Sequence, residues 1–352
     1  MSGKTKKSFV EALLLEIEKT KDYFKEKDIN SIYFGGGTPS QLNVSDIEKI
    51  MTKLKDYYEF NDNIEITLEA NPDDLDNSYI ENLTKIGINR ISLGVQSFND
   101  IDLRTFGRIH NSETAIKAIK SLKNNGFNNL SIDLIFGTPG SSKNEWIDNL
   151  NKFIELDINH LSCYNLTIEP KTEIFHKIKT KKTSAVDENL SAKLFLMTID
   201  FLQKNGFEHY EISNYARNGK YAIHNTNYWK GGFYLGLGPS AHSYNGQKRH
   251  WNISNTRIYI DSIKKGKSTT EEEILSLNDK YNEYIMTCLR TMWGVSLQTI
   301  EQDYNKFKRH FLKNIGVYIA QNKVVENNGI YFLSDKGKLF ADSLISDLFF
   351  ES

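Results

Sequence analysis

Five short apolar runs in the first half of the chain each end in residues suited to binding a polar ligand. The motifs that follow these runs occupy residues 35–40, 69–74, 96–98, 137–140 and 167–170. In a parallel β/α sheet the carboxyl ends of the strands lie on one side, where ligands bind. We therefore expect one shared site for a ligand of nucleoside or amino-acid type. The alternative is that glycine and proline only punctuate loops.

The glycine run at residues 35–37 and two carboxylates carry the clearest chemistry. Without Cβ atoms, Gly36 and Gly37 let a ligand reach the backbone N–H and C=O groups directly. Thr38 interrupts the spacing of a dinucleotide fingerprint, and the sequence has no Walker lysine at this loop. Glu69 and Asp133 lie on or just beyond apolar strands, where they suit ribose hydroxyl or amino groups.

Two further side chains fit the same ligand. Gln96 offers both a hydrogen-bond donor and an acceptor. Arg108 lies twelve residues later and can hold a carboxylate through two parallel hydrogen bonds. The alternative for Arg108 is an ordinary charge on a surface helix.

The hydrophobic pattern predicts an alternation of helices and strands up to residue 212. Helices are expected over 8–26, 45–58, 76–86, 111–125, 143–156 and 186–205, and strands over 31–34, 64–69, 90–95, 130–136, 160–166 and 207–212. The expected helix caps are Asp46, Asp76, Ser112 and Ser142, with Gly87 and Gly126 just past helix ends. Such alternation predicts an α/β fold with right-handed crossovers and a parallel sheet.

The pattern changes after residue 212 and divides the chain into three expected parts, 1–212, 213–278 and 279–352. The middle part is rich in aromatic residues, Asn and Gly, without a clear period. The last part predicts helices over 279–293, 297–304 and 307–321, an Asn-Gly hairpin near residue 328 and a final helix. This order resembles a winged helix. Because the segment 297–304 is acidic, we expect a packing or substrate-covering module and no nucleic-acid partner.

Composition restricts the class of protein. The 352 residues carry 44 basic and 45 acidic side chains, a net charge of -1, which gives no basic excess for nucleic acid. The sequence has no apolar run of about 18 residues that could span a membrane, which leaves peripheral membrane contact open. Two cysteines, Cys163 and Cys288, form neither a disulfide framework nor a metal-binding spacing. A reducing cytoplasm is the expected location.

Several motifs in the same order resemble one known family. They are residues 33–39 (YFGGGTP), 69–75 (EANPDDL), 94–99 (GVQSFN), 107–110 (GRIH), 133–140 (DLIFGTPG) and 210–216 (YEISNYA). Over nearly the whole chain the sequence resembles the oxygen-independent coproporphyrinogen III oxidases, a family of radical S-adenosylmethionine (SAM) proteins. Residues 224–229 (HNTNYW) fit the H-N-x-x-Y-W signature of its heme chaperone branch and are less like the decarboxylating oxidase.

The resemblance implies a partial parallel (β/α) barrel and a set of ligand-binding residues. By motif, S-adenosylmethionine would be bound by Gly36, Gly37, Thr38, Glu69, Gln96, Arg108 and Asp133. The glycine loop would meet the methionine amino group and Arg108 its carboxylate. His224 is the candidate heme contact, because a neutral imidazole is a good iron ligand. The alternative is a hydrogen-bonded structural histidine.

One departure from the family concerns its iron–sulfur cluster. The C-x-x-x-C-x-x-C loop that holds a [4Fe–4S] cluster is missing, as is the first barrel strand before it. Cys163 and Cys288 cannot supply three thiolates, so no metal site is expected in this chain. We expect an N-terminally truncated family member, since the later motifs are intact, and otherwise a natural cluster-free variant. The strand at 31–34 or its neighbour would then present an unpaired edge.

Three functions follow from the resemblance. The leading expectation is a heme chaperone that binds heme and passes it to an acceptor protein, whose identity the sequence does not give. The alternative is oxidative decarboxylation of coproporphyrinogen III, and the third is a cluster-free remnant that binds S-adenosylmethionine or a partner only. Oxidoreductase activity therefore stays open.

Overall fold

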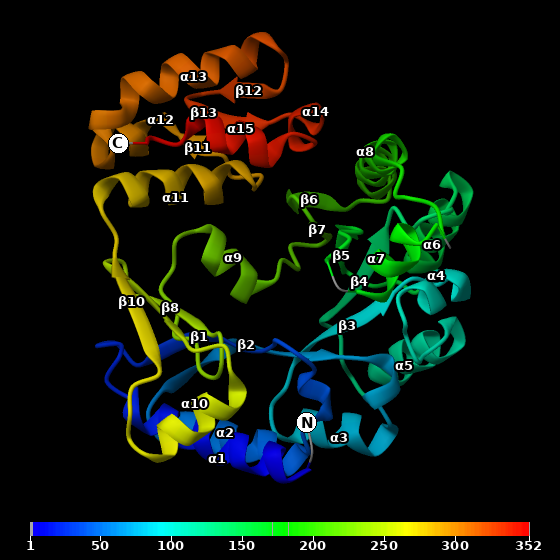
Figure 1. Cartoon of the computed structure of the whole chain (residues 1–352), viewed down its shortest axis with the longest axis vertical. Coiled ribbons are helices and arrows are strands. Elements are labelled where there is room, and N and C mark those ends of the chain that lie inside the picture. The colour runs from blue at the N-terminus through cyan, green and yellow to red at the C-terminus, as the bar shows by residue number, and fades with distance from the viewer. Residues whose placement is uncertain (1–2, 171, 182, 352) are drawn as a thin grey trace.

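The main element of the computed structural model is a curved, seven-stranded sheet (Figure 1). The structure describes residues 3–170, 172–181 and 183–351. Its first five strands pair in parallel in chain order: β1 (Asp28–Phe34), β2 (Glu59–Ala70), β3 (Arg90–Gln96), β4 (Leu130–Phe136) and β5 (His160–Asn165). This confirms the predicted partial parallel (β/α) barrel. Strand β1 forms one edge of the sheet.

The other edge differs from the expected parallel continuation. Strand β7 (Asn214–Ala216) pairs antiparallel with β5, and β6 (Glu208–Glu211) pairs antiparallel with β7. Only Ile212 and Ser213 connect β6 to β7, which is too short for a crossover and forces a hairpin. The seven-stranded sheet therefore extends past residue 212 to Ala216.

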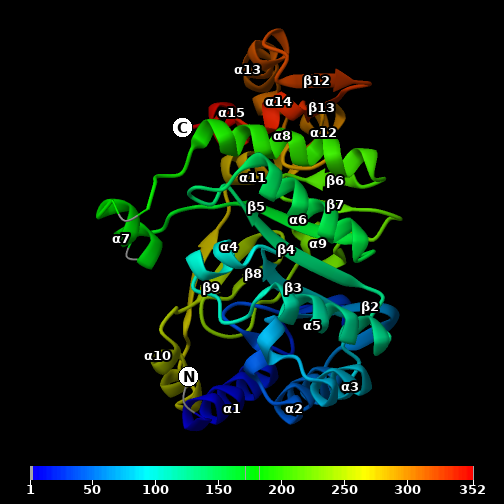
Figure 2. The ribbon, with the colours of Figure 1, turned by 90° about the vertical axis from the view of Figure 1, so that its right-hand side faces the viewer.

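Helices alternate with the parallel strands and cover the convex side of the sheet (Figure 1). They are α1 (Gly3–Lys19), α2 (Val44–Lys55), α3 (Asn77–Lys85), α5 (Ser112–Asn124), α6 (Lys143–Glu155) and α8 (Glu188–Lys204). The short helices α4 (Asp100–Thr105) and α7 (Glu173–Lys179) belong to the connections between them, and α7 projects away from the sheet (Figure 2). Helix α1 ends seven residues before the expected position, because the polar residues 18–22 give it no further apolar face. Alternate apolar strand residues such as Leu68, Ile91 and Ile132 form the core with these helices.

Two of the four expected helix caps are confirmed. The Asp76 carboxylate accepts the N–H of Tyr79, and Ser142 forms a reciprocal capping box with Glu145. The other two were assigned one to three residues too late, because asparagines precede the helices: Asn43 before α2 and Asn111 before α5. Gly87 and Gly126 adopt positive φ angles of 94° and 87° past their helices, as predicted.

The middle part of the chain forms short, ordered elements. These are α9 (Ile223–Trp229), β8 (His242–Tyr244), β9 (Lys248–Asn252), α10 (Thr256–Lys264) and β10 (Thr270–Ile274), and the three strands make an antiparallel sheet. Elements of three to nine residues are too short to give a clear hydrophobic period. Helix α10 packs beside α1 (Figure 2). The buried Glu16 carboxylate of α1 joins them by accepting the Tyr259 hydroxyl at 2.6 Å and the Gly238 N–H at 2.7 Å.

The C-terminal part has the predicted winged-helix order. It contains α11 (Leu277–Leu289), β11 (Val295–Ser296), α12 (Leu297–Asp303), α13 (Lys308–Ala320), β12 (Val324–Asn327), β13 (Ile330–Leu333), α14 (Asp335–Lys338) and α15 (Ala341–Leu348). It has a core of its own around Tyr281, Phe307 and Phe311. Its Lys338 ammonium donates to Nδ1 of His209 on β6 at 3.0 Å. In the part of the chain that the structure describes, no helix is long and apolar enough to cross a membrane.

Candidate functional site

Every second residue of the parallel strands points into the concave side of the sheet. Most of these residues are polar, so the concave side is polar. These inward residues are Ser31 and Tyr33 on β1, Glu65, Thr67 and Glu69 on β2, Arg90 and Ser92 on β3, Ser131 and Asp133 on β4, and His160, Ser162 and Tyr164 on β5. Their apolar neighbours point outward into the core. Helix α9 lies within this concave space (Figure 1).

The glycine loop after β1 contacts the carboxylate at the end of β2. The Gly36 N–H donates to Oε2 of Glu69 at 3.1 Å. Gly36 and Gly37 have φ angles of 76° and 73°, and the space where their Cβ atoms would lie is open. Thr38 follows them and precedes a short 3₁₀ helix, Pro39–Gln41, without capping it through its side chain. The loop therefore leaves room for a ligand beside Glu69.

Gln96, Asn71 and Arg108 form a second group next to this loop. Gln96 has a φ of 68°, an uncommon conformation for a residue with a side chain, and its amide nitrogen lies 2.8 Å from the position of a Cβ on Gly94. A larger residue at 94 would displace the Gln96 amide. Arg108 follows α4 and is half-buried, and it donates to Oδ1 of Asn71 at 3.5 Å. It is not an ordinary surface-helix charge.

Asp133 lies at the centre of the concave side. Ser92 donates to its carboxylate at 3.4 Å. Burial raises the pKa of Asp133 to about 6, a Ser162 hydrogen bond opposes the rise, and the nearby Glu69 charge adds to it. Burial also lowers the pKa of the Arg108 guanidinium, against the attraction of Asp133. Asp133 therefore lies close enough to both Glu69 and Arg108 for their charges to interact. Glu69 and Asp133 lie on the same side of the sheet, as the parallel strand ends predicted.

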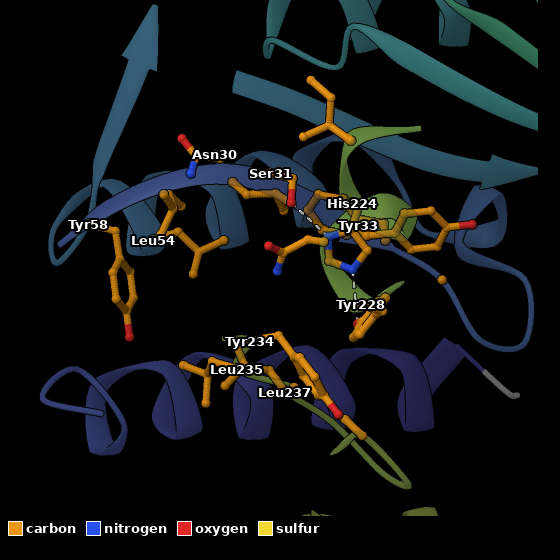
Figure 3. Close-up of a pocket in the computed structure, with 18 of the residues that line it drawn as sticks. Asn30, Ser31, Tyr33, Leu54, Tyr58, His224, Tyr228, Tyr234, Leu235 and Leu237 are labelled. Carbon is orange, nitrogen blue, oxygen red and sulfur yellow. Dashed lines mark hydrogen bonds between the residues drawn. The ribbon is translucent and has the colours of Figure 1, made fainter. Parts of the chain in front are cut away.

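His224 is the second residue of α9 and is held against β1 and β2. Its Nδ1 lies 2.9 Å from the Ser31 hydroxyl and its Nε2 lies 3.0 Å from the Tyr228 hydroxyl (Figure 3). Burial, with a smaller contribution from the Arg90 charge, lowers the pKa of His224 to about 4. The imidazole is therefore neutral at physiological pH. Both Glu65 carboxylate oxygens accept backbone N–H groups at the start of α9, from Ile223 at 3.1 Å and His224 at 3.0 Å.

A large cavity runs along the free edge of β1. Its volume is about 1660 Å³, and it is lined by β1, α1, α2, the glycine loop, α9 and the segment 233–237. His224, Tyr228 and Tyr234 line one end, and Leu54 and Tyr58 line the other (Figure 3). Gly36, Gly37 and Thr38 also line it, whereas Glu69, Gln96, Arg108 and Asp133 lie beside it on the concave side. The glycine loop thus lines the cavity together with His224 and also contacts Glu69.

Comparison with known proteins identifies the family. Residues 4–153 match the radical SAM superfamily, and residues 275–340 match the HemN C-terminal domain. Heme chaperone HemW of Haemophilus influenzae is 34% identical over 95% of this chain and 86% of its own length, and that of Lactococcus lactis is 32% identical over 99% and 93%. This chain belongs to the HemW family of radical SAM proteins. Coproporphyrinogen III oxidase (HemN) from Escherichia coli, 23% identical over 99% of this chain and 84% of its own, has the same fold with a TM-score of 0.84.

Radical SAM proteins bind S-adenosylmethionine and a [4Fe–4S] cluster, and the residues present fit only the first of these. The open glycine loop, two carboxylates and Arg108 offer groups complementary to an amino acid and a ribose. No group of three His, Cys, Asp or Glu side chains that could hold a metal occurs among residues 3–170, 172–181 and 183–351. Cys163 is buried in β5 and Cys288 belongs to α11 of the winged helix. The described chain does not fit the cluster of the HemW family.

Several residues around the site were not among the candidate site residues chosen from the sequence. Ser31 and Tyr33 contact His224, Asn71 accepts a hydrogen bond from Arg108, and Arg90 forms a buried ion pair with Glu65. A signal for the strand residues was present: polar side chains recur at every second position of otherwise apolar strands, which predicts a polar inner face. The contact between α9 and β1 joins residues almost 200 positions apart and leaves no local signal.

The raised pKa of Asp133 gives a pH-dependent prediction. Between pH of about 4 and 6 the folded state holds a proton that the unfolded state has released, so the free energy of unfolding falls as pH rises. Asp133→Asn should therefore stabilise the protein above pH 6, by about 1–3 kcal/mol, and have little effect below pH 4. Urea unfolding at several pH values measures this. The exposed Asp148→Asn serves as control, and equal pH profiles for wild type and Asp133→Asn would contradict the prediction.

Proposed function

We propose that this protein binds heme in the cavity beside β1, with His224 as iron ligand, and passes it to an acceptor protein. The observation that carries the proposal is the His224 imidazole at one end of a large cavity with aromatic walls. Burial lowers the pKa of this imidazole and so favours its neutral form. At about 1660 Å³ the cavity exceeds the roughly 300–1,000 Å³ of ordinary small-molecule sites. Flat aromatic and apolar side chains can cover the faces of a porphyrin while one imidazole meets the iron.

The hydrogen bonds of His224 suit this role. Ser31 occupies Nδ1 and fixes the orientation of the ring, as partners of metal-binding histidines do. Nε2 is bonded to the hydroxyl of Tyr228, a residue that is 38% exposed. Iron would replace that hydroxyl at Nε2. The relatives named heme chaperone HemW support the same assignment.

A heme titration tests the proposal. The wild-type chain should bind hemin with a histidine-ligated Soret spectrum, and His224→Ala should shift the spectrum and weaken binding by at least about tenfold, or about 1.4 kcal/mol. His242 lines the same cavity but stacks on Trp251, so His242→Ala is the matched control and should keep the wild-type spectrum. Circular dichroism checks that both variants keep their fold. A His224→Ala spectrum and affinity equal to wild type would remove His224 from the site.

The proposal also covers S-adenosylmethionine binding, the acceptor protein and the cellular compartment. S-adenosylmethionine is proposed to bind at Gly36, Gly37, Thr38, Glu69, Gln96, Arg108 and Asp133, and the acceptor is a protein of unknown identity. Both cysteines are free thiols, which supports a reducing compartment such as the cytoplasm. An assay for coproporphyrinogen III decarboxylation, run beside the heme titration, separates the chaperone from the oxidase.

A further inference from the structure

Tyr33 touches both candidate ligand sites at once. Its hydroxyl donates to Oε1 of Glu69 at 2.7 Å, in the candidate SAM site. Its ring stacks on the His224 imidazole, with ring centroids 5.0 Å apart and an interplanar angle of 24°. One side chain therefore joins the carboxylate of one site to the imidazole of the other.

The glycine loop is shaped around this side chain. A Cβ on Gly35 would lie 2.5 Å from Cε1 of the Tyr33 ring and 3.0 Å from Oε1 of Glu69, so any larger residue would push the ring and the carboxylate apart. The other Glu69 oxygen accepts the Gly36 N–H at 3.1 Å. Burial, then the Glu69 charge and hydrogen bond, raise the pKa of Tyr33, so its hydroxyl remains a donor. The loop, Glu69 and Tyr33 form one packed unit.

We propose that Tyr33 couples the two sites, so that S-adenosylmethionine bound at Glu69 strengthens heme binding at His224. The inference rests on the proposed function. An amino or hydroxyl group of the ligand bonded to Glu69 restricts the carboxylate, which fixes the Tyr33 hydroxyl and its ring. The fixed ring and the Ser31 hydroxyl then hold the imidazole with Nε2 toward Tyr228 and the cavity (Figure 3). An imidazole that is already held in the binding orientation has a higher affinity for heme iron. By thermodynamic linkage, bound heme strengthens the binding of S-adenosylmethionine by the same factor.

The test measures the affinity for hemin with and without saturating S-adenosylmethionine. In the wild type, S-adenosylmethionine should lower the hemin Kd by about 5- to 10-fold, within the usual range of coupling between two sites. Tyr33→Phe keeps the stacked ring and loses the hydroxyl, so the ratio of the hemin Kd without S-adenosylmethionine to the Kd with it should fall to about one. Tyr58→Phe is the matched control, because Tyr58 lines the same cavity but donates to the Thr20 carbonyl. Tyr58→Phe should show the same decrease of the hemin Kd on adding S-adenosylmethionine as the wild type.

A second measurement separates this inference from the proposed function. In protein labelled with ¹⁵N-histidine and free of heme, S-adenosylmethionine should shift the imidazole resonances of His224 in the wild type and in Tyr58→Phe, but not in Tyr33→Phe. If the wild type binds no hemin, the proposed function fails and the imidazole shifts alone decide the coupling. Two results would overturn the role of Tyr33. One is a wild type in which S-adenosylmethionine changes neither the imidazole resonances of His224 nor the hemin Kd. The other is a Tyr33→Phe variant in which S-adenosylmethionine still changes the resonances or the Kd.

Discussion

Replacing Glu65 by alanine should lower the free energy of unfolding by about 3–5 kcal/mol, the cost of breaking a buried ion pair by removing one partner. Glu65 and Arg90 are 3% and 1% exposed, and Oε2 of Glu65 lies 3.6 Å from Nε of Arg90. Without Glu65 the guanidinium would remain charged in the interior. The change would also leave the backbone N–H groups of Ile223 and His224 without their acceptor.

Urea unfolding of single and double variants measures this effect. Glu65→Ala and Arg90→Met should each be strongly destabilising, and the double variant should cost less than their sum, because it leaves no unpaired charge. Asp200→Asn breaks the exposed pair with Lys204 and should cost less than about 1 kcal/mol. A loss below 1 kcal/mol for Glu65→Ala, or strictly additive costs, would contradict a structural role for the buried pair.

Glu65 also matters for the proposed heme site, because its carboxylate attaches α9 to the sheet. The helix has only seven residues, and none of them is fully buried. A helix this short is marginal in isolation. Its position therefore depends on the two hydrogen bonds to Glu65 and on the contacts of His224 with Ser31 and Tyr33. Loss of Glu65 should weaken hemin binding together with stability.

The parallel sheet was predictable because its signals are local. Each strand is a run of apolar residues, and each following helix has a hydrophobic stripe long enough to establish a period. The strand at 130–136 was predicted residue for residue, and the helix at 143–155 to within one residue. Glu69 and Asp133 were predicted to lie at the same end of the partial barrel, because the carboxyl ends of parallel strands lie on the same side. Their electrostatic contact agrees with that geometry.

The remaining features depend on long-range contacts or on very short elements. Strand β7 has three residues and could not be recognised from a period of two, so the hairpin at 208–216 was read as one more parallel strand. The cap at Asn111 competed with the neighbouring Ser112, and both residues are good caps by type. Tyr33 belongs to a recognised motif, but its contact with His224 arises only when α9 folds into the concave side.

Anaerobic reconstitution of these 352 residues with iron and sulfide should yield no [4Fe–4S] cluster. The cluster of radical SAM proteins needs three thiolates, and the chain has two cysteines in separate parts of the fold. Burial raises the pKa of the Cys163 thiol, and it raises that of Cys288 to about 11, which disfavours the thiolate that iron requires. Iron and sulfide analysis, with an assay for 5′-deoxyadenosine, measures the result.

The double variant Cys163→Ser, Cys288→Ser is the control for adventitious iron. If neither thiol holds a cluster, the variant and the wild type should retain the same small amount of iron after desalting. About four irons per chain in the wild type, lost in the variant, would contradict the prediction and mean that the two cysteines assemble a cluster with ligands from elsewhere. Hemin binding should be the same in both proteins, because neither cysteine lines the cavity beside β1. Heme binding at His224 would then be independent of iron–sulfur chemistry in this chain.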